Sequence, residues 1–195
     1  MPAGIFVISA PSGTGKTTIA RLLTQRIPHL VRSISCTTRP PRPGERDGVD
    51  YHFISRRRFL NMLRRGEFAE WACVYGHYYG TPRKPVEEAL RGGFPVLLTI
   101  DTQGALQIRE KFPSAVLIGI LPPSLKEQER RMRAREGMDE QTIQERLAAS
   151  RAERRILREK YDFRVVNRDL AKTISRIESI IMRCLSKHAI STPSV

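Results

Sequence analysis

The segment from residue 5 to residue 26 constrains the fold more than any other part of the chain. Ile5–Ser9 is a short, continuous apolar run, which is typical of a parallel strand buried on both faces. A glycine-rich turn follows it, and Thr17–Arg26 then repeats apolar residues with helical periodicity. This order of strand, glycine loop and helix predicts an α/β architecture whose first loop faces a bound anion.

Later apolar runs repeat the same pattern. Three more buried strands are predicted at Pro95–Ile100, Ala115–Leu121 and Phe163–Val166, each followed by a helical stretch. The helices are expected to begin near Thr102, Ser124 and Asp169. Alternation of strands and helices in this way predicts an α/β fold with a doubly wound, mainly parallel sheet.

Two segments interrupt this core without forming separate domains. Residues 33–81 change to short alternating pieces, which predict an inserted mixed α/β lobe. Residues 124–160 are strongly charged and helical with a break at Gly137, a composition suited to a mobile lid over a polar site. We therefore expect a single domain over residues 1–195, whose core is formed by residues 1–32, 82–123 and 161–195.

The chain carries a formal net charge of +14, which favours anionic partners such as nucleotides. Nucleic acid is an unfavourable candidate, because arginine clusters such as Arg56–Arg58 and Arg151–Arg158 contain almost no aromatic residues for base stacking. No apolar run approaches the roughly 20 residues that a membrane helix requires, and the N-terminus is too weakly basic for a signal peptide. Three cysteines without CxxC spacing fit a reducing compartment, so we expect a soluble, cytoplasmic protein.

The glycine loop has the residues of a nucleotide phosphate-binding loop. Gly13 and Gly15 allow the backbone to approach phosphate oxygens, and the N-terminus of the following helix attracts negative charge. Lys16 is expected to neutralise the β- and γ-phosphates of ATP, and the Thr17 hydroxyl is expected to hold Mg²⁺. The predicted ATP-binding residues of this loop are Ala10, Pro11, Ser12, Gly13, Thr14, Gly15, Lys16, Thr17 and Thr18.

A more specific signal comes from four segments of the inserted lobe, which are Ser35–Glu45, Gly48–Tyr51, Glu70–Ala72 and Tyr78–Thr81. They resemble, in order, the GMP-binding segments of the guanylate kinase family of P-loop nucleoside monophosphate kinases. The resemblance implies that the chain transfers the γ-phosphoryl group of Mg-ATP to GMP. It also implies that the GMP phosphate is held by Arg39, Arg42, Tyr51 and Tyr79, and the guanine by Ser35, Glu70, Thr81 and Asp101.

The residue types at these positions suit that chemistry. Arg39 and Arg42 lie three apart in a proline-rich loop and can present guanidinium groups to one phosphate, to which tyrosine hydroxyls would add further donors. Glu70 could accept hydrogen bonds from both N1–H and N2–H₂ of guanine, whereas adenine would leave this carboxylate unpaired. Because an unpaired buried polar group costs about 1–3 kcal/mol, such a pocket would reject AMP.

Arginines of the predicted lid resemble those of nucleoside monophosphate kinases at Arg131, Arg135 and Arg146. On a helix, Arg131 and Arg135 share one face, so both could reach the same phosphoryl group and stabilise the charge that spreads over it during transfer. The predicted catalytic residues are Lys16, Arg39, Arg131, Arg135 and Arg146. Asn167 resembles the family position beside the ATP adenine, although an asparagine that caps a turn fits nearly as well.

The chain departs from the family at Thr99, where an acid is usual. Loss of this acid removes a negative charge from the site and predicts weaker Mg²⁺ affinity or slower turnover, in part offset by the threonine hydroxyl. Two other functions stay open: a phosphopeptide-binding module with the same fold, and a kinase for another phosphorylated acceptor such as a ribose bisphosphate. Lys16 and Thr17 favour the enzyme over the module, and the guanine-binding set favours GMP.

Overall fold

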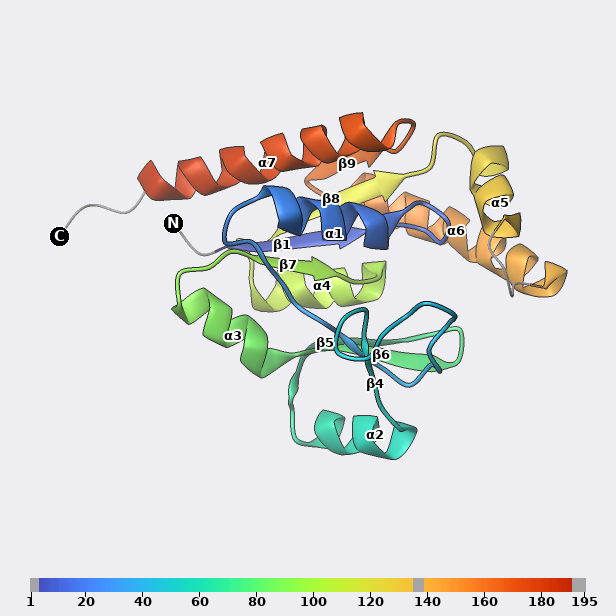
Figure 1. Ribbon diagram of the computed structural model, residues 1–195, viewed down its shortest axis with the longest axis horizontal. Helices are drawn as coiled ribbons and strands as arrows, with labels where there is room; N and C mark the ends of the chain where they lie inside the picture. Colours follow the sequence, from blue (N-terminus) through green and yellow to red (C-terminus); the bar gives the residue numbers. More distant parts are fainter. Residues whose placement is uncertain (1–3, 135–138, 191–195) are drawn as a thin grey trace.

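A parallel β-sheet forms the centre of the computed structural model, which describes residues 4–134 and 139–190 (Figure 1). Its five strands follow the order β2-β7-β1-β8-β9, and every neighbouring pair is parallel. The strands are β1 Ile5–Ser9, β2 Val31–Arg32, β7 Val96–Thr99, β8 Val116–Leu121 and β9 Phe163–Val166.

Helices cover both faces of this sheet. One hydrophobic cluster joins α1 and α7 to the sheet through residues such as Leu23 and Ile177, and a second joins α3, α4 and α6 to the opposite face through residues such as Ile108 and Leu157. Because both faces are buried at the centre of the sheet, β1, β7 and β8 consist of nearly continuous apolar runs. These helices are α1 Lys16–Arg26, α3 Arg83–Arg91, α4 Thr102–Lys111, α6 Glu140–Lys160 and α7 Leu170–Ile190.

A second, four-stranded sheet of order β4-β3-β6-β5 lies on the α3–α4 side of the central sheet (Figure 1). Its own small core stacks Phe59 on Phe68, with the ring centroids 4.4 Å apart. Lys111 at the end of α4 donates a hydrogen bond of 2.7 Å to the carbonyl of Ala69, which ties this sheet to the central core. The elements are β3 Cys36–Thr37, β4 His52–Phe53, α2 Arg56–Arg64, β5 Phe68–Val74 and β6 His77–Pro82.

Helix α5, Leu125–Arg133, and the first half of α6 lie beyond the carboxyl ends of the parallel strands (Figure 1). Each helix begins at a side-chain cap. The Ser124 hydroxyl accepts from the Glu127 amide at 3.1 Å, and the Asp139 carboxylate accepts from the Thr142 amide at 2.7 Å. Within the described ranges, no helix is both long and apolar enough to cross a membrane.

The prediction of a doubly wound, mainly parallel α/β sheet is confirmed, and the four predicted buried strands are all present, with ends that differ by one residue at most. The edge strand β2 was not predicted, because two residues carry no periodic signal. Gly137, the predicted break in the lid, lies outside the described residues. The division into core, inserted lobe and lid stays a prediction.

The topology brings two loops together at one edge of the central sheet. Strands β1 and β7 are neighbours, so the loop after Ser9 and the segment after Thr99 leave the sheet side by side. The Ser9 hydroxyl donates to the Asp101 carbonyl at 3.3 Å, which links the two exits. Ligands of open α/β sheets bind at the carboxyl ends of the strands, and this edge is therefore where a site is expected.

Candidate active site

The loop between β1 and α1 lines the site and contains two glycines in a left-handed backbone conformation. Gly13 and Gly15 have φ angles of 79° and 92°, in the left-handed region that favours glycine. A Cβ on Gly13 would also lie 3.0 Å from the Met132 Cγ atom, so helix α5 packs against the loop at this point. Gly15 is the residue before α1, whose first turn contains no acidic residue to oppose a bound anion.

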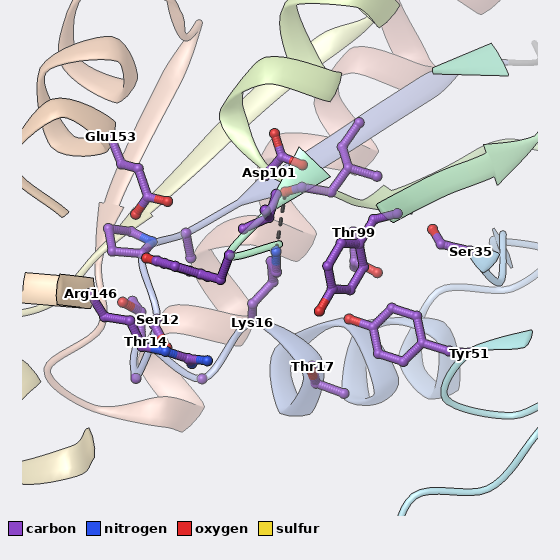
Figure 2. Close-up of a pocket in the computed structure, with 18 of the residues that line it drawn as sticks. Ser12, Thr14, Lys16, Thr17, Ser35, Tyr51, Thr99, Asp101, Arg146 and Glu153 are labelled. Atoms are coloured by element: carbon purple, nitrogen blue, oxygen red, sulfur yellow. Dashed lines mark hydrogen bonds between the residues drawn. The ribbon is translucent and has the colours of Figure 1, made fainter. Parts of the chain in front are cut away.

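Lys16 extends from this loop toward the end of β7. Its Nζ atom donates to the Ile100 carbonyl at 3.2 Å, as drawn in Figure 2. Enclosure by the walls of the site lowers the pKa of Lys16, whereas the carboxylates of Asp101 and Glu153 act in the opposite direction. Lys16 lies in the middle of the site in Figure 2, between Arg146 and Glu153 on one side and Tyr51 on the other.

A buried carboxylate forms the end of the site that faces the second sheet. Glu70 is 2% exposed and accepts two hydrogen bonds from Thr81, one from the amide at 3.0 Å and one from the hydroxyl at 2.6 Å. Burial raises the pKa of Glu70 to about 7. The Ser35 hydroxyl lies 3.4 Å from that of Thr81, so these three side chains form one polar group.

Gly104 leaves the space that the Glu70 side chain occupies. A Cβ at this position of α4 would lie 2.1 Å from the Glu70 Oε2 atom. Asp101 holds the same end of the helix, because its Oδ1 atom accepts from the amides of Gln103 and Gly104 at 2.7 and 3.1 Å. The start of α4 thus fixes the position of Glu70 and also supplies Asp101 to the wall of the site.

Two tyrosines and an arginine–glutamate pair form the side wall. The rings of Tyr51 and Tyr79 meet edge to face with centroids 5.9 Å apart, and burial raises the pKa of Tyr51, so its hydroxyl is a donor at neutral pH. Arg39 lies behind them, with its Nη2 atom 3.0 and 2.8 Å from the Glu45 carboxylate oxygens. Glu45 also accepts from the amide of Arg42 at 2.8 Å. This carboxylate therefore connects both arginines of the proline-rich loop.

Helix α6 closes the opposite side of the site. Arg146 donates to the Ser12 hydroxyl at 3.2 Å, and its guanidinium lies over the ring of Tyr75 at 4.9 Å. Glu153 lies seven residues later on the same helix face, and burial raises its pKa. Tyr75 has a φ of 50° in the turn between β5 and β6, which orients its ring toward α6.

These groups line one cavity of about 340 Å³. The predicted site residues that line it are Ala10, Pro11, Ser12, Gly13, Thr14, Gly15, Lys16, Thr17, Thr18, Ser35, Arg42, Tyr51, Glu70, Tyr79, Asp101 and Arg146. Three other predicted residues do not line it but contact residues of its wall: Arg39, Thr81 and Asn167. Arg131 does not line the cavity either, because its guanidinium pairs with Glu127 and donates to the carbonyl of Asn167. Arg135 lies outside the described residues.

Comparison with known proteins agrees with this geometry. The family model described as guanylate kinase matches residues 3–184. The guanylate kinases of Myxococcus xanthus and Gloeobacter violaceus are 45% and 46% identical, over 94% and 92% of this chain and 88% and 90% of their own lengths. The crystal structure of guanylate kinase from Anaplasma phagocytophilum superimposes with a TM-score of 0.78 at 36% identity, covering 93% of this chain and 85% of that one.

The chain belongs to the guanylate kinase family. Guanylate kinases are nucleoside monophosphate kinases, so this chain is a phosphotransferase, and the family predicted from the lobe segments is confirmed. Membership also accounts for the presence of a phosphate loop and a buried carboxylate in the wall of one cavity.

Three polar side chains that line the cavity were not assigned a role from the sequence: Glu45, Tyr75 and Glu153. Glu45 belongs to the quoted segment Ser35–Glu45, but nothing in its spacing shows that it pairs with an arginine six residues earlier. Glu153 could have been found, because a spacing of seven residues from Arg146 places both on one face of a helix. Tyr75 carries no such signal, since its direction depends on the backbone of a turn.

Proposed function

We propose that this chain catalyses the Mg²⁺-dependent transfer of the γ-phosphoryl group from ATP to the phosphate of GMP, giving ADP and GDP. The observation that carries this proposal is the arrangement of the groups that line the cavity of about 340 Å³. Ser12 of the phosphate loop lies on one side of Lys16 in Figure 2 and Ser35 on the other, and Ser35 belongs to the polar group that contains Thr81 and Glu70. Such an arrangement suits two substrates that meet with their phosphates at the centre.

The donor phosphates would occupy the loop. Backbone amides of residues 13–18 and the N-terminus of α1 would bind the phosphate oxygens, while Lys16 would move its ammonium from the Ile100 carbonyl to the β- and γ-phosphates. The exposed Thr17 hydroxyl stands in the first turn of α1 and lines the cavity, a position that fits a ligand of Mg²⁺.

The metal site fits an ion that arrives with its substrate. No group of three or more His, Cys, Asp or Glu side chains in the described ranges could hold a metal by itself. Mg²⁺ commonly keeps several waters and binds through one or two protein oxygens together with substrate phosphates. Thr17 would be such a ligand, and the bound ion would neutralise charge on the β- and γ-phosphates.

GMP would bind with its base at Glu70 and its phosphate at the side wall. The ionised Glu70 carboxylate would accept from guanine N1–H and N2–H₂, with Ser35, Thr81 and Asp101 beside it. Tyr51, Tyr79 and Arg42 would bind the GMP phosphate, and Arg39, held by Glu45, would add its charge from behind the tyrosines.

The transfer itself requires positioning and charge stabilisation. The attacking group is a phosphate oxygen of GMP, which is already anionic at neutral pH, so no general base is needed. Arg146 already contacts Ser12 of the phosphate loop, and its Nε atom has no hydrogen-bond partner among the described residues. Together with Arg131 and Arg135 it would stabilise charge on the transferring group, while Asn167 would lie beside the adenine.

We place the enzyme in the cytoplasm, where its three free cysteines would stay reduced.

The test is an ADP-release assay with Mg-ATP and each of GMP, AMP, UMP, CMP, a ribose bisphosphate and no acceptor. We expect turnover with GMP alone and a loss of at least about a thousandfold in Lys16→Ala, because Lys16 acts on the reacting phosphates. Lys84→Ala is the matched control, since the Lys84 side chain is 84% exposed on α3. Turnover of a ribose bisphosphate in place of GMP, or no turnover by a folded protein, would contradict the proposal.

A further inference from the structure

Two buried carboxamides contact the phosphate loop on the side away from the cavity. The Nε2 atom of Gln128, on α5, donates to the carbonyl of Ser12 at 3.0 Å, and the Nδ2 atom of Asn167, after β9, donates to the carbonyl of Thr14 at 2.8 Å. Gln128 is 0% exposed and Asn167 is 5% exposed. A buried amide is costly unless it is hydrogen-bonded, so each of these side chains depends on its contact with the loop.

Each carboxamide is oriented by a hydroxyl group from a different helix. Ser150, on α6 and itself 0% exposed, donates to the Oε1 atom of Gln128 at 3.0 Å. Thr173, on α7, donates to the Oδ1 atom of Asn167 at 3.1 Å. A flipped Gln128 amide would place its own oxygen against the Ser12 carbonyl, whereas the Ser150 hydroxyl could pair with either end of the amide. The Ser12 carbonyl therefore keeps the NH₂ group toward the loop, and Ser150 satisfies the amide oxygen.

Fixing these carbonyls also fixes the amides that follow them. In a trans peptide unit the C=O and the next N–H point in opposite directions, and no described peptide bond is cis. A Ser12 carbonyl held by Gln128 therefore directs the Gly13 N–H away from α5, and a Thr14 carbonyl held by Asn167 does the same for the Gly15 N–H. Both glycines line the cavity, whereas neither carboxamide does.

We propose that Gln128 is a positioning residue for the phosphate loop. Held by Ser150, it keeps the Ser12–Gly13 peptide turned so that the Gly13 amide faces the donor phosphates. This inference rests on the proposed function, in that it takes the loop as the site of ATP phosphates. It concerns the donor nucleotide alone, because the Glu70 end of the cavity has no contact with Gln128 among the described hydrogen bonds.

The same contact couples the loop to the two helices beyond the strand ends. Ser12 is held by α5 through its carbonyl and by α6 through its hydroxyl, which accepts from Arg146 at 3.2 Å. A Cβ on Gly13 would lie 3.2 Å from the backbone oxygen of Gln128, so the loop is in direct contact with α5. Gln128 and Ser150 thus join α5, α6 and the loop in one buried chain of hydrogen bonds.

The alternative is that Gln128 and Ser150 only fill the interface between α5 and α6. Three variants separate the two explanations: Gln128→Met, Ser150→Ala and the double variant. Gln128→Met alone leaves the Ser150 hydroxyl buried without an acceptor and should lower Tm, whereas the double variant replaces both partners by apolar groups and should recover most of that loss. Neither Gln128→Met nor the double variant can donate to the Ser12 carbonyl.

Calorimetric titration of each variant with Mg-ADP and with GMP gives the decisive comparison. We expect Kd for Mg-ADP and KM for ATP to rise about tenfold in Gln128→Met and in the double variant, with Kd for GMP within about twofold of wild type. Ser150→Ala should give a smaller rise in Kd for Mg-ADP. Gln144→Leu, at an exposed position of α6, is the control and should change neither affinity.

A double variant that recovers both Tm and the wild-type Kd for Mg-ADP would overturn the inference and leave Gln128 a packing residue. A parallel rise in both Kd values would overturn it too, because it would show general damage to the site. A different result would contradict the proposed function. If the wild-type protein bound neither Mg-ADP nor ATP, the loop would not be a site for donor phosphates, and the inference about Gln128 would also be wrong.

Discussion

Glu70 is the ionisable group through which binding of GMP should change the protonation of the protein. Burial raises its pKa to about 7, so in the empty site it is divided between the acid and the carboxylate near neutral pH. Guanine presents N1–H and N2–H₂ donors at this position, and only the ionised carboxylate can accept both. Binding of GMP should therefore remove a proton from Glu70.

The size of this effect follows from the pKa. With a pKa of about 7, roughly half of the empty molecules carry the proton at pH 7, so GMP binding should release about 0.5 proton there, about 0.9 at pH 6 and about 0.1 at pH 8. The apparent affinity scales with the fraction that is competent to bind. GMP should therefore bind about tenfold more weakly at pH 6 than at pH 8 from this cause alone.

The assay is calorimetric titration of GMP in buffers of different ionisation enthalpy, which counts the protons released. Because the GMP phosphate also titrates, with a pKa of about 6, the control is Glu70→Gln, which keeps the phosphate contribution and removes that of the carboxylate. The difference between the two proteins isolates Glu70. Equal proton release by both at pH 7 would refute the reasoning.

The raised pKa of Glu70 also changes how the stability of the protein depends on pH. A pKa raised from the ordinary 4.5 to about 7 means that protonated Glu70 stabilises the empty protein fully below about pH 4.5, and that this stabilisation is lost as the pH rises through about 7. The loss corresponds to about 3 kcal/mol. Glu70→Gln should therefore raise the free energy of unfolding at pH 8, by an amount that is reduced because the neutral amide forms weaker hydrogen bonds with Thr81. At pH 4 the substitution should not raise the free energy of unfolding. Urea unfolding at the two pH values measures this.

Two further substitutions test the walls of the site. Gly104→Ala places a Cβ 2.1 Å from the Glu70 Oε2 atom, so KM for GMP should rise by roughly 10- to 100-fold, as expected for loss of a charged hydrogen-bond acceptor, while Kd for Mg-ADP stays unchanged. An unchanged KM would show that Glu70 is not the guanine acceptor. Thr99→Asp restores an acid beside Lys16 and should lower the Mg²⁺ concentration for half-maximal turnover by about tenfold, with Thr99→Asn as the uncharged control. Equal values for both variants would contradict a role for the charge.

The parts of the fold that the sequence predicted are those whose pattern is set by burial alone. β1, β7 and β8 lie inside a sheet with both faces covered, so each is a nearly continuous apolar run with sharp ends, whereas the edge strand β9 includes the exposed Arg164. The second sheet could be predicted only as a mixed lobe, because β3 and β4 have two residues each and their pairing depends on distant strands.

The candidate site divides in the same way. Residues that act through the backbone of a local motif, such as Gly13 and Gly15, can be identified from the sequence once the strand before them and the helix after them are predicted. Residues that act through contacts between distant segments of the chain cannot be recognised in this way. The Glu45–Arg39 contact and the Gln128–Ser150 contact depend on how separate segments meet, and no single-sequence pattern specifies either.

The surroundings of Thr99 limit what its departure from the family pattern should change. The predicted cost was the loss of a negative charge from the site. Lys16, however, still faces the carboxylates of Asp101 and Glu153, which raise its pKa against the effect of burial and help to keep its ammonium charged. A lysine that lost its charge would no longer neutralise the donor phosphates. Since Glu153 approaches from α6 and Asp101 from the segment after β7, two independent elements provide this support, and the consequence of Thr99 should be confined to the metal.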